Sequence, residues 1–78
     1  MNLVEFSELI VKKLVKEPDL VKVEELEDGD NTVIEILVSE EDMGRVIGKE
    51  GKIAKAIRTL VKANAAKLNK RVNVEIIE

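Results

Sequence analysis

The residues best suited to chemistry form one short run, Gly44-Arg45-Val46-Ile47-Gly48-Lys49-Glu50-Gly51-Lys52-Ile53. Glycines let a backbone come close to a ligand, and the start of a helix offers unpaired N–H groups together with a positive dipole end. Positive charge surrounds the glycines, from Arg45, Lys49, Lys52 and Lys55. The combination predicts a loop that holds phosphate groups.

Two other kinds of glycine-rich phosphate loop do not fit this run. A nucleotide-binding P-loop has the pattern Gly-x-x-x-x-Gly-Lys-Ser/Thr. Here Gly44 and Gly48 are one residue too close, and Glu50 follows the lysine. The dinucleotide pattern Gly-x-Gly-x-x-Gly lacks its first pair of glycines. What remains is a Gly-x-x-Gly pair, Gly48 and Gly51, whose meaning depends on the elements around it.

The composition excludes most catalytic sites. The chain has no cysteine and no histidine. It therefore lacks a thiol nucleophile, a disulfide framework, the commonest general base and the commonest neutral metal ligand. No segment has the ligand spacing of a calcium-binding loop. We expect no catalytic residue, no metal, no cofactor and no small-molecule substrate.

Aromatic and long apolar segments are also scarce. Phe6 is the single aromatic residue, so the base stacking that single-strand binders commonly use is almost excluded. Unbroken apolar runs such as residues 36–38 are much shorter than a membrane span or a signal-peptide core. The sequence predicts a cytoplasmic chain with no membrane attachment.

Positive charge is concentrated in the middle of the chain. The net charge is −3 over 78 residues. Residues 1–40 carry 4 Lys and 11 Asp or Glu, whereas residues 45–71 carry 9 Lys or Arg and a single acid, Glu50. Local potential, and not total charge, steers a polyanion toward a surface. The middle segment therefore suits nucleic acid.

Hydrophobic spacing predicts the elements that position the glycine run. Leu3, Phe6, Ile10 and Leu14 recur at helical spacing and predict a helix over residues 2–16. Alternating residues predict strands over 20–27, 32–38 and 72–76, the first two forming a hairpin around residues 28–31. Glu25 interrupts the first strand, which a bulge or an edge position would explain.

Two helices are expected on either side of the glycine pair. A short helix over 39–47 would end at Gly48 in a left-handed conformation, and a longer helix would run over 51–68. The order α-β-β-α-α-β predicts an α+β fold with a three-stranded mixed sheet, helices on one face, and the second and last strands parallel. The length predicts a single domain over residues 1–78.

In this context the run from Arg45 to Ile53 resembles the signature of the KH domain, and the element order resembles the bacterial type II KH fold. The resemblance covers nearly the whole chain, from Leu3 to Ile77. A free-standing domain of this size is similar to small bacterial RNA-binding proteins of the KhpA type. The resemblance implies single-stranded RNA binding, as an RNA chaperone or post-transcriptional regulator. It also implies self-association, a KhpB/Jag-like KH-containing partner, and a link to cell-wall and cell-length control.

The resemblance also assigns roles to residues. The loop Gly48–Gly51 would clamp the backbone of about four nucleotides. The nucleotides would lie in a groove beside this loop. Ile36 and Val38, or their neighbours on that strand, would form the wall of the groove opposite the loop. Glu50 departs from the most favourable pattern, because an acid repels phosphate. The RNA-binding residues predicted in this way are Gly44, Arg45, Ile47, Gly48, Lys49, Glu50, Gly51, Lys52, Ile53 and Lys55.

Simpler interpretations remain open for several of these residues. The glycines could merely end and start helices. Val46 and Ile47 lie on a short amphipathic helix and are expected to pack in the core. For Lys52 and Lys55, phosphate contact and plain solvation are both open. Lys62, far along the helix, is interpreted as solvated. The acidic stretch over residues 24–30 is interpreted as a solvated hairpin and not a metal site.

The longer helix has more apolar surface than one packing face needs. One stripe consists of Ala54, Ile57, Val61, Ala65 and Leu68, and a second set, Ile53, Ala56, Leu60 and Ala63, widens it. We expect Ala56, Leu60 and Ala63 to form a contact between two copies of the chain. The alternative is an ordinary exposed leucine among small residues.

Two rival functions stay open. The chain could be an interaction module that keeps the fold and works mainly by pairing with another protein, which its overall acidity and Glu50 favour. It could also be an enzyme that binds a nucleotide in the glycine loop. The missing histidine, cysteine and P-loop residues argue against the second rival.

Overall fold

The structure, a computed structural model, describes all residues from 1 to 78. Along the chain lie α1 (Leu3–Leu14), a 3-10 turn η1 (Pro18–Leu20), β1 (Lys22–Asp28), β2 (Asn31–Leu37), α2 (Glu40–Lys67) and β3 (Val72–Ile77). The element order expected from the sequence is confirmed. The long α2 contains both of the expected helices, which meet at a kink at Gly48–Gly51.

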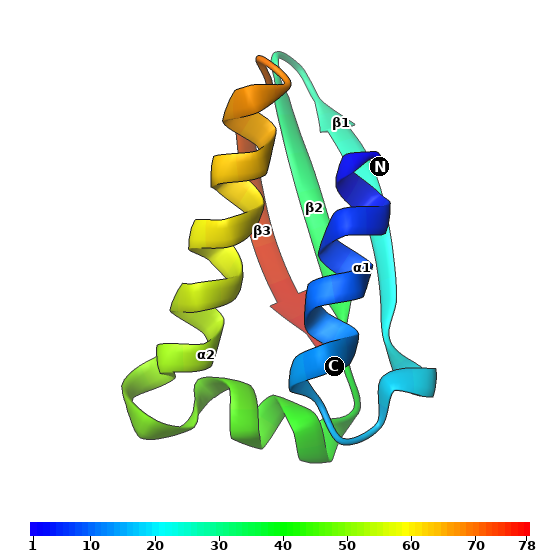
Figure 1. Cartoon of the computed structure of the whole chain (residues 1–78), viewed down its shortest axis with the longest axis vertical. Helices are drawn as coiled ribbons and strands as arrows, with labels where there is room; N and C mark the ends of the chain where they lie inside the picture. Colours follow the sequence, from blue (N-terminus) through cyan, green and yellow to red (C-terminus); the bar gives the residue numbers. More distant parts are fainter.

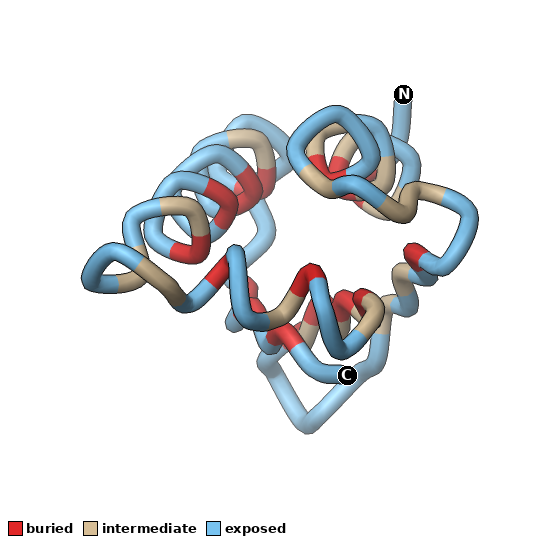
Figure 2. The backbone as a smooth tube through the Cα atoms, turned by 90° about the horizontal axis from the view of Figure 1, so that it is seen from below, coloured by how far each residue is buried: buried red, intermediate tan, exposed pale blue.

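The three strands form one mixed sheet in the order β1-β2-β3. β1 and β2 are antiparallel, and β2 and β3 are parallel, as predicted. Both helices cover the same face of the sheet, and the other face is open (Figures 1 and 2). The register of β1 with β2 is continuous, so Glu25 sits on an edge strand without a bulge. Its carboxylate faces the helix side and lies 3.3 Å from Nζ of Lys70.

The hydrophobic core fills the space between the sheet and the two helices, as Figure 2 shows by the buried segments that face one another. Every second residue of β2 and β3 points toward the helices and is buried, including Ile34, Ile36, Val72, Val74 and Ile76. From α2, the predicted stripe Ala54, Ile57, Val61 and Ala65 is buried. Leu68 was wrongly included, because it follows the last helical residue and is 46% exposed.

The first helix begins as predicted but buries a different stripe. Asn2 and Glu5 form a capping box, in which Oδ1 of Asn2 accepts the N–H of Glu5 at 2.8 Å. The buried residues are Leu3, Ser7 and Val11. The predicted stripe is therefore wrong at Leu14, which is exposed at the end of α1. A serine gives no hydrophobic signal, so the sequence pattern followed the half-buried Phe6 and Ile10 instead.

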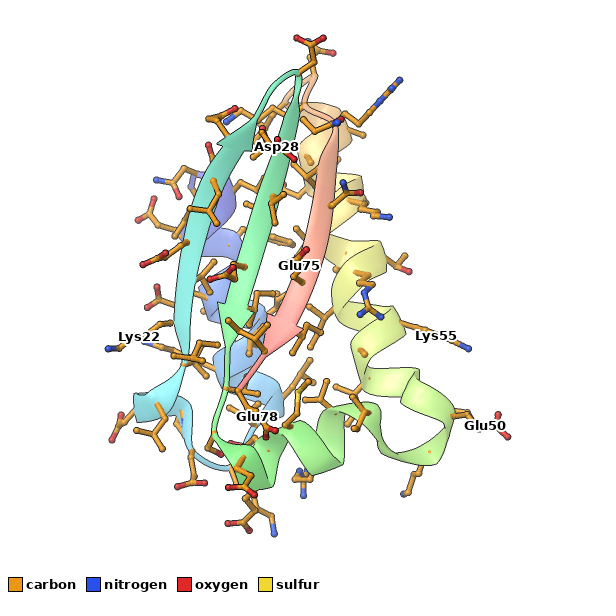
Figure 3. All side chains as sticks on the ribbon, turned by 180° about the vertical axis from the view of Figure 1, so that it is seen from behind. Lys22, Asp28, Glu50, Lys55, Glu75 and Glu78 are labelled. Atoms are coloured by element: carbon orange, nitrogen blue, oxygen red, sulfur yellow. The ribbon has the colours of Figure 1, made fainter.

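The open face of the sheet carries three glutamates in one row. Glu35 on the central strand pairs directly with Glu24 on β1 and with Glu75 on β3. None of the three carboxylates forms an ion pair. Figure 3 shows Glu75 on the open face. Like charges directly opposite each other destabilise a sheet, so this row lowers the stability of the fold.

Replacing Glu35 by Lys is expected to stabilise the domain by about 0.5–1 kcal/mol, because it turns two repulsive cross-strand pairs into attractive ones. The free energy of unfolding from urea denaturation measures the change. The gain should shrink at high salt, which screens exposed charges. Glu78→Lys makes the same charge change outside the strands and should give little gain. Equal gains in both variants would contradict the explanation.

Candidate nucleic-acid interface

The loop between the two halves of α2 turns the chain into a new direction through three consecutive left-handed residues (Figure 1). Lys49, Glu50 and Gly51 have φ values of 52°, 64° and 69°. Gly48 has a φ of −68° and a ψ of 168°. The prediction that Gly48 adopts the left-handed conformation is therefore wrong. The first segment of α2 ends because its backbone becomes extended at Gly48, and the change of direction follows one residue later.

The two loop glycines serve different needs. At Gly51 the positive φ favours glycine, since a side chain there is strained. Gly48 has an ordinary φ, and a Cβ added to it would meet no atom within 4 Å. The fold would thus accept a side chain at Gly48. A glycine at this position leaves the backbone open to close approach from outside, which suits a ligand-binding loop.

A hollow of about 300 Å³ lies against the loop. It is lined by Gly44, Arg45, Gly48, Lys49 and Ile53. These are five of the ten residues predicted to bind RNA, and they come from both sides of the kink. Gly44 lies inside the first helical segment, where a Cβ would also meet no atom within 4 Å. The hollow therefore combines exposed backbone with two cationic side chains, a suitable setting for phosphate.

The other predicted residues lie around the hollow without lining it. Lys52 and Lys55 are exposed on the first turns after the loop, and Glu50 is exposed within it. Figure 3 shows Glu50 and Lys55 projecting on the same outer side of the molecule. Ile47 is 57% exposed, so its predicted core packing is wrong, whereas its neighbour Val46 is buried as expected. Successive helical residues face different directions, so only one of the two can point into the core.

The two strand residues named for the groove wall opposite the loop cannot contact a ligand. Ile36 and Val38 are 0% and 3% exposed and belong to the core. The reason is topological, since β2 is the central strand and α2 lies beside β3 (Figures 1 and 3). The edge strand β3 is therefore the one next to α2.

A buried carboxylate holds the first segment of α2 in place. Asp42 is completely buried and accepts the backbone N–H groups of Lys16 and Glu17, both at 2.9 Å, and the hydroxyl of Ser39 at 3.2 Å. Ser39 Oγ in turn accepts the N–H of Asp42 at 3.1 Å and caps α2. The carboxylate thus ties the connection after α1 to the helix that carries Gly44 and Gly48.

Burial and hydrogen bonding act in opposite directions on the Asp42 carboxyl. Desolvation is the largest single influence and raises its pKa. The bonds from Lys16, Glu17 and Ser39, with the nearby charge of Arg45, together outweigh it and leave the pKa below the ordinary value of 3.8. In the sequence, the three-residue spacing of Ser39 and Asp42 indicates only a local helix cap. The contacts of Asp42 with residues 16 and 17, more than twenty positions away, had no sequence signal.

No group of three or more acidic, cysteine or histidine side chains is arranged to hold a metal ion. Neither α1 nor α2 combines the length and the apolar composition needed to cross a lipid bilayer.

Comparison with known proteins gives consistent matches over nearly the whole chain. The family model for the KhpA/KhpB KH domain matches residues 4–76. The RNA-binding protein KhpA of Clostridium perfringens is 56% identical over 73 residues, which cover 94% of this chain and 97% of that protein. The protein of the same name from Borreliella burgdorferi is 48% identical over 77 residues, covering 99% and 94% of the two chains.

Solved structures of Era contain the same fold. Aquifex aeolicus Era bound to GDP and aluminium fluoride superposes with a TM-score of 0.67 at 24% identity. Era in complex with MgGDPNP and nucleotides 1506–1542 of 16S ribosomal RNA gives 0.68 at 24% identity. In both cases the match covers 96% of this chain and 29% of Era. The type II KH architecture is therefore confirmed, and the chain belongs to the KhpA/KhpB KH-domain family.

Proposed function

We propose that this chain, a single KH domain over residues 1–78, binds single-stranded RNA and catalyses no reaction. The observation that carries the proposal is the loop Gly48–Gly51, whose open backbone starts a helix beside the cations Arg45 and Lys49. The relatives from Clostridium perfringens and Borreliella burgdorferi are named RNA-binding proteins, which supports the same conclusion.

The proposed mechanism needs no cofactor and no metal. Backbone N–H groups at the start of the second helical segment attract phosphate oxygens. Arg45, Lys49, Lys52 and Lys55 supply counter-charge, and the aliphatic Ile47 and Ile53 contact the bases. Because phosphate contacts dominate, affinity should be modest, weakly dependent on base sequence and strongly dependent on salt.

Fluorescence anisotropy of end-labelled RNA tests the proposal. The label must be on the RNA, since the chain has no Trp or Tyr. Single-stranded RNA should bind with an affinity that falls steeply as salt rises, and a duplex of the same sequence should bind more weakly. A duplex that binds as well as the single strand, or no binding at low salt, would reject the proposal.

Glu50 is expected to limit affinity. It is exposed within the loop, and an acid about 6 Å from a phosphate is repelled by roughly 0.7 kcal/mol even in water. Glu50→Gln should therefore raise RNA affinity about threefold at low salt and less at high salt. Glu75→Gln removes the same charge from the open face of the sheet and should leave anisotropy titrations nearly unchanged. An equal gain from Glu75→Gln would show that only net charge matters and would contradict a specific effect of Glu50.

The proposal includes a homodimer or a mixed pair with a KhpB/Jag-like KH-containing protein, acting in the cytoplasm as an RNA chaperone or post-transcriptional regulator. A role in cell-wall and cell-length control belongs to the same proposal. Ala56, Leu60 and Ala63 follow each other at helical spacing, and Leu60 is 45% exposed. Small residues around a leucine suit close packing of two helices, so this stripe is the proposed dimer contact.

Leu60→Asp is expected to shift a dimer to a monomer, because it places a charge in the centre of the proposed contact. Analytical ultracentrifugation measures the mass in solution. Leu26→Asp is the matched control, since Leu26 is 42% exposed on β1. A Leu60→Asp protein that sediments like the unmodified chain would rule out this contact.

A second candidate function is a protein-interaction module whose RNA binding is weak or supplied by its partner. The acidic row of Glu24, Glu35 and Glu75 on the open face supports it, because the row destabilises the sheet without forming an ion pair. RNA affinity of the isolated chain discriminates between the two functions.

A further inference from the structure

The second half of α2 carries a row of cations without partners. All five charged residues from Gly51 to the end of α2 at Lys67 are basic. Lys55, Arg58 and Lys62 follow at spacings of three and four, so they share one side of the helix. Figure 3 shows that Lys55 projects outward from α2, on the side where Glu50 marks the loop. The row therefore continues the outer side of the loop along the helix axis.

None of these three cations is neutralised by the protein. All three are exposed. The basic side chains that lie within 4.0 Å of a carboxylate are Lys12 and Lys70, and neither belongs to the row. Arg58 and Lys62 are four residues apart, a spacing at which like charges destabilise a helix. A polyanion bound along the row would remove this repulsion.

The row and the hollow lie on different sides of the same loop. Ile53 lines the hollow, whereas Lys55, two positions later, does not, because two helical residues are turned by about 200°. From Lys55 to Lys62 the helix rises about 10 Å. An RNA chain held at the loop therefore has a cationic surface available beyond the hollow.

We propose that Lys55, Arg58 and Lys62 form a second contact for RNA, which takes the phosphates of nucleotides beyond the roughly four that a KH loop clamps. The inference rests on the proposed function. It also assigns to Lys62 a role beyond that of the solvated side chain expected from the sequence. Arg58 and Lys62 act as positioning charges for the outgoing strand, and the loop remains the primary grip.

The test compares oligomers of about four and about eight nucleotides on the unmodified chain and on an Arg58→Gln, Lys62→Gln variant. Gln has a similar helix propensity to Arg and Lys, so the fold should persist, and circular dichroism checks this. Lys13→Gln, Lys22→Gln is the control, since both lysines are exposed on α1 and β1. Isothermal titration calorimetry gives the affinities.

The unmodified chain and the control should bind the longer oligomer about tenfold more tightly than the shorter one. The Arg58→Gln, Lys62→Gln variant should lose this gain and keep its affinity for the short oligomer. Its salt slope on the longer oligomer should fall by about 1.4, because two cations no longer neutralise phosphates. The inference is overturned if the variant loses affinity equally for both oligomers. It is also overturned if the variant still binds the longer oligomer about tenfold more tightly than the shorter one. Absence of binding to either oligomer by the unmodified chain overturns the proposed function and this inference with it.

Discussion

A Gly48→Asp, Gly51→Asp double variant is expected to lose about 100-fold or more of its affinity for single-stranded RNA. The variant places two carboxylates where the backbone is proposed to meet phosphate. Loss of two charge-assisted hydrogen bonds, worth about 1.5–3 kcal/mol each, corresponds to this factor. Fluorescence anisotropy measures the affinity.

The variant should remain folded, and a matched control is available. Gly48 has an ordinary φ and free space around it, so Asp fits there. At Gly51, with φ +69°, Asp carries a strain of about 1 kcal/mol. Gly29→Asp makes the same change at φ +63° in the β1–β2 turn. The Gly29→Asp variant should carry similar strain and keep its RNA affinity. Equal losses of RNA affinity in Gly29→Asp and Gly51→Asp would contradict binding by the loop at Gly48–Gly51.

The largest effect on stability is expected at Asp42. Asp42→Ala leaves two backbone N–H groups and the Ser39 hydroxyl at the start of α2 without their acceptor. We expect the free energy of unfolding to fall by about 3 kcal/mol, which for a domain of this size lowers Tm by about 15 °C. Thermal unfolding followed by circular dichroism measures it. Ser39→Ala removes the helix cap but keeps the Asp42 carboxylate, so it should lower the free energy of unfolding by only about 1 kcal/mol.

The contribution of Asp42 should also depend on pH. Its pKa in the folded protein lies below 3.8, so the charged form is favoured by folding. The stabilisation is therefore complete above the unfolded pKa and is lost as pH falls through the lowered folded value. The difference in unfolding free energy between the unmodified chain and Asp42→Asn should be constant from about pH 5 to 7 and shrink below about pH 4. A difference that grows toward low pH would contradict this assignment.

Local signals in the sequence predicted most of the fold. The turn at residues 28–31 and the strict alternation in β3 act over a few residues, so one sequence suffices to detect them. The buried apolar stripe on the second half of α2 could also be predicted, because Ala54, Ile57 and Val61 recur at helical spacing. Parallel pairing of β2 with β3 followed from the two helices that connect them.

Predictions failed where the outcome depends on packing between distant segments. The wall assigned to Ile36 and Val38 was wrong because only the three-dimensional strand order makes β3 the neighbour of α2. The contacts of Asp42 join residues 25 and 26 positions apart and have no periodic signature. Ile47 was assigned to the core because it is an apolar residue on a short amphipathic helix, but its neighbour Val46 is the residue that points into the core.

The backbone amides of the glycines show directly whether the loop at Gly48–Gly51 binds RNA. The chain has four glycines, Gly29, Gly44, Gly48 and Gly51, and their amide signals can be followed in a 15N–1H correlation spectrum as single-stranded RNA is added. We expect the signals of Gly44, Gly48 and Gly51 to shift together and saturate, while Gly29 in the distant hairpin stays fixed. Saturable RNA binding that moves Gly29 and leaves Gly48 and Gly51 in place would contradict this expectation.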